Sequence, residues 1–145
     1  MITVAGGDSI TWGSELKDSP HGGPNGYSRE TFAALLAGKN YICSAYPGIG
    51  NREIASRVIS AVEQLIFTKI PCMVLVCWTW PSRDNTVDSD DCILELQQYL
   101  ELHMIPYMFT CVDNCVITNN PKIDWSQWYM SVSYTHLTLP TILLV

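Results

Sequence analysis

The chain has 145 residues, a formal net charge of −6 at pH 7, and 48% hydrophobic against 15% charged residues. This size and composition predict one globular domain with its own core and exclude a disordered protein. The eight Lys and Arg residues are scattered along the sequence and form no basic patch. Because binding to phosphate backbones needs clustered positive charge, we expect no nucleic-acid partner.

The amino-terminal segment has neither the basic start nor the long apolar core of a signal peptide, and no apolar run approaches the roughly 20 residues of a membrane helix. We therefore expect a cytoplasmic protein with no membrane partner, and its six cysteines as reduced thiols. Cys111 and Cys115 have a spacing that metal ligands use, but no second Cys or His pair accompanies them. We expect no metal site and no organic cofactor.

The first half of the chain predicts two strands and two helices. Residues 2–5 form a short apolar run that ends in two glycines, as a buried strand does. A helix is expected over 27–38, with Ser28 as N-cap and an apolar face made of Phe32, Leu35 and Leu36. A strand over 41–43 follows. Asn51 then caps a long amphipathic helix, whose apolar face is Ile54, Val58, Val62, Leu65 and Ile66.

The second half continues this alternation. Residues 72–78 are an uninterrupted apolar run, typical of a strand buried on both faces of a parallel sheet. A helix over 90–103 and a strand over 105–112 follow. Strands that alternate with helices predict an α/β domain with a parallel sheet.

The end of the chain departs from this pattern. Residues 132–145 carry no charge, and Pro140 interrupts their apolar run. The segment resembles a tail that recurs at the ends of unrelated proteins from assembled metagenomic reads, where adapter sequence has been translated. We predict a domain over 1–131, incomplete at its carboxyl end, and a non-native tail over 132–145 that packs poorly against the core.

Polar or glycine-rich loops follow three of the predicted strands, at residues 7–11, 47–51 and 78–83. The carboxyl ends of parallel strands share one edge of the sheet, where α/β proteins place their sites. We therefore expect Ser9, Gly48 and Thr79 to converge at that edge.

The first loop carries a family resemblance. Gly7-Asp8-Ser9, directly after the first strand and followed by Thr11-x-Gly13, resembles the GDS block of the SGNH (GDSL-type) hydrolases. The resemblance covers residues 2–131 and implies a three-layer α/β/α, flavodoxin-like fold in which Ser9 attacks an ester. It makes Asp8 a candidate substrate-binding residue. The alternative is that Asp8 and Ser9 only cap a helix after the first strand.

The second loop adds a candidate oxyanion hole. Gly48 stands where the family has a glycine whose backbone N–H joins that of the nucleophilic serine in holding the oxyanion. Glycine suits this position because no Cβ obstructs the approach of the substrate. Asn51, just beyond, is either a second substrate-binding residue or only the cap of the following helix.

The third loop differs from the family pattern. The family has G-x-N-D there, with an Asn that donates to the oxyanion, whereas Thr79 occupies the Asn position in this chain. A Thr hydroxyl also donates a hydrogen bond. The stretch from Trp78 to Arg83 resembles a phage and environmental subgroup, which implies a viral origin. Arg83 either steers an acidic group or pairs with Asp84 or Asp88, and we favour the surface pair.

No histidine is assigned as the general base, which the family supplies from an Asp-x-x-His block. His21 follows Asp18 at that spacing but lies on the first loop. His103 closes a predicted helix, and His136 falls in the tail.

The resemblance implies hydrolysis of a small-molecule or glycan ester, for example an acyl group on a carbohydrate or lipid. Ser9, Gly48 and Thr79 are the expected catalytic residues. The alternative is a non-catalytic binding or structural module, such as a phage particle component, which the Thr in place of Asn and the missing histidine favour.

Overall fold

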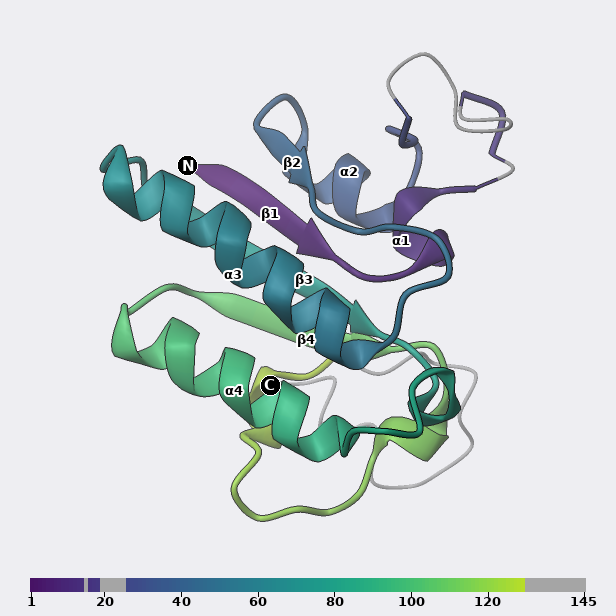
Figure 1. Ribbon diagram of the computed structural model, residues 1–145. Coiled ribbons are helices and arrows are strands. Elements are labelled where there is room, and N and C mark those ends of the chain that lie inside the picture. The colour runs from purple at the N-terminus through teal and green to yellow at the C-terminus, as the bar shows by residue number, and fades with distance from the viewer. Residues whose placement is uncertain (15, 19–25, 130–145) are drawn as a thin grey trace.

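The computed structural model describes residues 1–14, 16–18 and 26–129 (Figure 1). The predicted tail, His21 and His136 lie outside the described residues. In chain order the elements are β1 (Ile2–Gly6), α1 (Ser9–Trp12), α2 (Phe32–Ala37), β2 (Tyr41–Cys43), α3 (Asn51–Phe67), β3 (Cys72–Trp78), the 3-10 turn η2 (Pro81–Arg83), α4 (Ser89–Leu102), β4 (Tyr107–Cys111), and the 3-10 turns η3 (Asn114–Val116) and η4 (Trp125–Gln127). Within the described part of the chain, no helix has the length and apolarity to cross a membrane.

The strands form one parallel sheet in the order β2-β1-β3-β4, which confirms the predicted α/β class. The chain runs outward from β1 to β2 and then returns across β1 to β3. Because parallel crossovers are right-handed, this reversal puts α2 on one face of the sheet and α3 on the other (Figure 1). The result is a three-layer, flavodoxin-like arrangement. The reversal between β1 and β3 is the switch point at which such sheets open a crevice.

The main core lies between the sheet and the pair α3 and α4. The predicted apolar face of α3 is confirmed at Ile54, Val58, Val62 and Leu65, whereas Ile66 is exposed. The sheet contributes large side chains to this core, and the Trp78 ring meets that of Phe109 edge-on at 5.4 Å. Each fully buried aliphatic side chain here contributes about 1.5–3 kcal/mol to folding.

Helix α2 is shorter than the sequence predicts. Thr31 is its N-cap, and the Thr31 hydroxyl accepts a hydrogen bond from the Ala34 amide at 3.2 Å. The predicted cap at Ser28 is therefore wrong, because the Ser28 hydroxyl instead accepts from the Glu30 amide, before the helix begins. Ala33 and Ala34 face the sheet, since small side chains let this short helix lie close to it.

The predicted apolar face of α2 is also wrong. Phe32, Leu35 and Leu36 are 41%, 70% and 71% exposed. With Met108 and Tyr129 they border an apolar hollow of about 540 Å³ over the β3–β4 side of the sheet. On this face α2 covers mainly β1 and β2, so the described residues leave β3 and β4 partly uncovered.

Candidate active site

Strand β1 leads directly into the four-residue helix α1, whose first residue is Ser9. The carboxylate of Asp8 caps this helix by accepting a hydrogen bond from the Ile10 amide at 3.0 Å. A Cβ on Gly7 would overlap the side chain of Thr11, so the turn requires glycine there. Asp8 therefore caps a helix, as one interpretation of the sequence predicted. Ser9 is half-buried, and neither its hydroxyl nor its amide has a hydrogen-bond partner among the described residues.

The Asp8 carboxylate is fully buried at the switch point between β1 and β3. Its Oδ2 atom accepts a 2.6 Å hydrogen bond from the Thr79 hydroxyl and lies 3.7 Å from Nη2 of Arg83. These contacts compensate a buried charge that would otherwise be costly. They also fasten the start of α1, and with it Ser9, to the carboxyl end of β3.

Thr79 is also fully buried, and its one hydroxyl hydrogen is directed to Asp8. A hydroxyl has one hydrogen to donate, so this geometry gives Thr79 a bond inside the protein in place of the expected bond to an oxyanion. Thr79, which stands where the family pattern has Asn, therefore positions Asp8.

Asn51 is 2% exposed, and its side chain joins three elements. Its Nδ2 donates to the Thr79 carbonyl at 3.0 Å and to the Ser89 hydroxyl at 2.9 Å, while its Oδ1 accepts from the Thr79 amide at 2.9 Å. The N-cap of α3 is Gly50, so the predicted cap at Asn51 is wrong. Asp8 and Asn51 both direct their polar atoms into the protein, and the structure gives these two predicted substrate-binding residues a structural role.

Gly48 lies in the exposed turn that follows β2. Its φ of 81° is a left-handed conformation that favours glycine, and nothing lies within 4 Å of where a Cβ would stand. The loop is tied to the turn after β1, because the Tyr46 amide donates to the Gly7 carbonyl at 3.2 Å. The Gly48 amide has no protein partner in the described part of the chain. Ser9, Gly48 and Thr79 thus follow three adjacent strands at the same sheet edge, as the sequence predicts.

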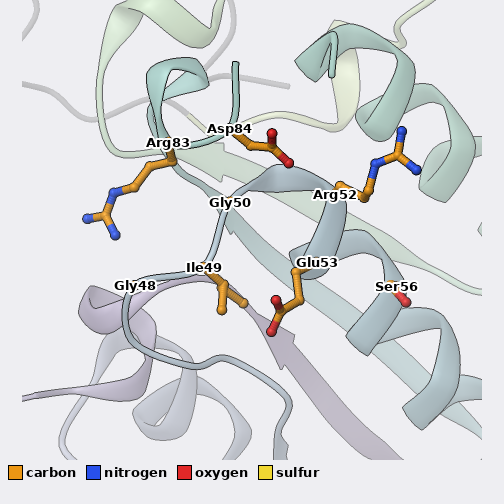
Figure 2. Close-up of a pocket in the computed structure, with 8 residues that line it drawn as sticks. All are labelled: Gly48, Ile49, Gly50, Arg52, Glu53, Ser56, Arg83 and Asp84. Atoms are coloured by element: carbon orange, nitrogen blue, oxygen red, sulfur yellow. The ribbon is translucent and has the colours of Figure 1, made fainter. Parts of the chain in front are cut away.

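A cavity of about 380 Å³ opens beside this edge, between the Gly48 loop, α3 and η2 (Figure 2). It is lined by Gly48, Ile49, Gly50, Arg52, Glu53, Ser56, Arg83 and Asp84.

The predicted surface pair of Arg83 with Asp84 or Asp88 is wrong, because the ion pair of Arg83 is with Asp8. Asp84 instead accepts from the Thr86 amide at 3.0 Å and from the Thr86 hydroxyl. These bonds, with the charge of Arg52 adding a smaller effect, lower the pKa of Asp84.

Two other groups near the sheet are unsuited to catalysis. Burial, with smaller contributions from Asp8 and Cys111, raises the pKa of the Cys77 thiol to about 12, so this thiol is no nucleophile at neutral pH. His103 follows the last residue of α4 and packs against Tyr99 with ring centroids 4.6 Å apart. It precedes β4 and therefore lies at the amino end of the sheet, opposite Ser9. Across the described residues, no group of three or more His, Cys, Asp or Glu is arranged to hold a metal ion.

The chain matches no protein-family model, and no curated protein or solved structure is significantly similar to it. The arrangement of the loops at the carboxyl edge of the sheet is therefore the basis for inferring a function.

Proposed function

We propose that this protein hydrolyses esters and that the Ser9 hydroxyl is the nucleophile. The observation that carries the proposal is the setting of Ser9 at the switch point of the sheet. It begins a helix there, and its hydroxyl and amide have no protein partner among the described residues. Sites that act on acyl groups need such a nucleophile beside backbone N–H donors.

In the proposed reaction, Ser9 Oγ bonds to the acyl carbon while a general base takes the hydroxyl proton. The carbonyl oxygen becomes an oxyanion, to which the amides of Ser9 and Gly48 donate. Collapse of this intermediate breaks the ester C–O bond, and the base returns the proton to the departing alcohol. Water then attacks the acyl-serine by the same steps and releases the acid and free Ser9. Thr79 acts indirectly, by holding Asp8 and the start of α1 in place.

The proposal requires a base, and no described histidine lies near Ser9. Nucleophile and base act as a unit, so a site without its base keeps only about 10³–10⁴-fold catalysis over water, from the oxyanion hole and binding. Unless His21 or His136, which lie outside the described residues, supplies the base, we expect very slow turnover of activated esters by the 145-residue chain. A form of the protein that includes a histidine base should be fast.

The test is p-nitrophenyl acetate turnover by the wild type and by Ser9→Ala, with Ser56→Ala as matched control. Ser56 lines the neighbouring cavity but is exposed on α3. The assay is run on the 145-residue chain and on any longer product of the same reading frame. We expect fast turnover in a base-containing form to be lost in Ser9→Ala and kept in Ser56→Ala. Fast Ser9-dependent turnover by the short chain would identify His21 or His136 as the base.

The second candidate is a binding or structural module that keeps the fold without the chemistry. The bond from the Thr79 hydroxyl to Asp8 favours it, because the expected side-chain donor is turned away from any oxyanion. Absence of Ser9-dependent turnover in every length, on every ester tried, would select this candidate.

A further inference from the structure

Arg83 is held firmly at the rim of the cavity in Figure 2. It ends the 3-10 turn η2, and its amide donates to the Trp80 carbonyl at 3.0 Å. Its guanidinium carbon lies 5.6 Å from the centre of the Trp80 ring, and Nη2 lies 3.7 Å from Oδ2 of Asp8. The side chain is nevertheless 31% exposed. Arg83 is thus restrained at its charged end while part of that end faces solvent.

The hydrogen-bonding capacity of this guanidinium is unused. A guanidinium has five N–H donors, and a separation of 3.7 Å from Asp8 is too long for a hydrogen bond. Asp8 already accepts from the Ile10 amide and the Thr79 hydroxyl. Among the described residues, no acceptor forms a hydrogen bond with the Arg83 side chain. The ion pair with Asp8 therefore orients Arg83 without occupying its donors.

The side chain also points to the Gly48 side of the cavity. In Figure 2, Arg83 extends on the side of Gly48, whereas the carboxylate of Asp84 points the opposite way, toward Arg52. Asp8, the ion-pair partner of Arg83, directly precedes Ser9 in the chain. Arg83 therefore shares the cavity with Gly48 and contacts the residue directly before Ser9.

We propose that Arg83 binds an anionic group, a carboxylate or a phosphate, on the ester that Ser9 attacks. The substrate class is then esters that carry an acidic group near the scissile carbonyl, and this inference rests on the proposed function. Arginine suits the task because its planar fork pairs two N–H groups with two oxygens. The formal net charge of −6 makes the protein as a whole unattractive to anions, so a local arginine has to supply the attraction.

The test is a binding titration followed by NMR on ¹⁵N-labelled protein at constant ionic strength. The probes are monomethyl succinate and methyl phosphate as anions, with dimethyl succinate as the neutral control. We expect at least one anion to shift the amide signals of Ser9 and Gly48 and the Nε–H signal of Arg83. We expect Arg83→Gln to weaken binding by about tenfold or more, because charge-assisted hydrogen bonds are lost.

The matched control is Arg52→Gln, which removes the same charge from the same cavity but on the side of Asp84. We expect it to leave anion binding nearly unchanged. Equal weakening by both variants, or no shift of the Arg83 Nε–H signal with either anion, would overturn the proposal. Arg83→Gln could fail to fold because Asp8 loses its partner. In that case a shift of the Arg83 Nε–H signal of the wild type on addition of an anion supports the proposal, and no shift with either anion overturns it.

The two proposals can fail separately. Anion binding through Arg83 without Ser9-dependent hydrolysis of any ester would support the anion site and contradict the hydrolase. Ser9-dependent hydrolysis with equal kcat/KM for monomethyl and dimethyl succinate would support the hydrolase and overturn the anion site.

Discussion

Replacing Thr79 by Val tests whether the bond between Thr79 and Asp8 holds the site together. Val has nearly the shape of Thr, so the substitution removes the hydroxyl and creates no cavity. The bonds of the Thr79 backbone to Asn51 remain. The lost bond is 2.6 Å long and joins two fully buried side chains. A hydrogen bond to a charged group contributes about 1.5–3 kcal/mol, so we expect the free energy of unfolding to fall by that amount.

The measurement is urea denaturation followed by circular dichroism, with two controls. Thr79→Ser keeps the hydroxyl and loses one methyl group, which costs about 1 kcal/mol. Thr118→Val removes a similar bond, from the Thr118 hydroxyl to Asp90 at 2.7 Å, but on the exposed surface. Because water replaces such a bond readily, we expect a loss below about 1 kcal/mol there. We therefore expect the free energy of unfolding to fall clearly more in Thr79→Val than in Thr118→Val.

A stability loss in Thr79→Val no larger than that in Thr118→Val would contradict a stabilising bond between Thr79 and Asp8. Full stability of Thr79→Val, together with a kcat lowered by about 10²-fold in a base-containing form, would contradict that role as well. That result would mean that the hydroxyl donates to the oxyanion during turnover, as the family resemblance implies.

Three further predictions concern stability, each measured by urea denaturation. Asn51→Asp should lower the free energy of unfolding by about 2–5 kcal/mol, because it removes both Nδ2 hydrogen bonds, to the Thr79 carbonyl and the Ser89 hydroxyl, from a buried cluster. A loss below about 1 kcal/mol would contradict a role of Asn51 in joining these residues. Leu96→Ala should cost about 2–5 kcal/mol, whereas Leu35→Ala, at a 70% exposed position, should change stability by less than about 1 kcal/mol; equal losses would show that α2 is covered in solution. Burial raises the pKa of the Cys77 thiol from 9.0 to about 12, so with rising pH the thiol ionises first in the unfolded chain. The contribution of this thiol to the free energy of unfolding is therefore fully present below pH 9 and is lost as the pH rises toward 12. The slope from this thiol is at most about 1.4 kcal/mol per pH unit, and Cys77→Ala should flatten it.

Elements whose apolar residues follow one clear pattern, that of a strand or that of a helix, were predictable from the sequence. The strand over 72–78 has its observed bounds because an unbroken apolar run fits a strand buried on both faces. Helix α3 follows from its helical spacing of apolar residues. Helix α2 has apolar or small residues all round, from Phe32 to Ala37, so its periodicity does not define a buried face. The buried face of this helix consists of Ala33 and Ala34, whose small side chains pack closely against the sheet.

The edge of the sheet at which the site lies was predictable, but the bonds within the site were not. Strand order and direction bring Ser9, Gly48 and Thr79 to one edge whatever their side chains do. The bond between Asp8 and Thr79 joins residues 71 positions apart and depends on side-chain orientation. No local pattern distinguishes an Arg83 that pairs with Asp84 from one that pairs with a buried Asp8.

The most direct test of the central claim is to identify the residue that an activated ester acylates. The protein is incubated with p-nitrophenyl acetate, quenched in acid and mapped by peptide mass spectrometry. This measurement suits even a site without its base, because p-nitrophenolate is a good leaving group and acylation then depends on a base less than the later attack of water does, so acetyl-serine accumulates. We predict an acetyl group on Ser9 that is absent from Ser9→Ala and from urea-unfolded protein. Acetylation confined to lysines, or equal labelling of Ser9 in folded and unfolded chains, would contradict it.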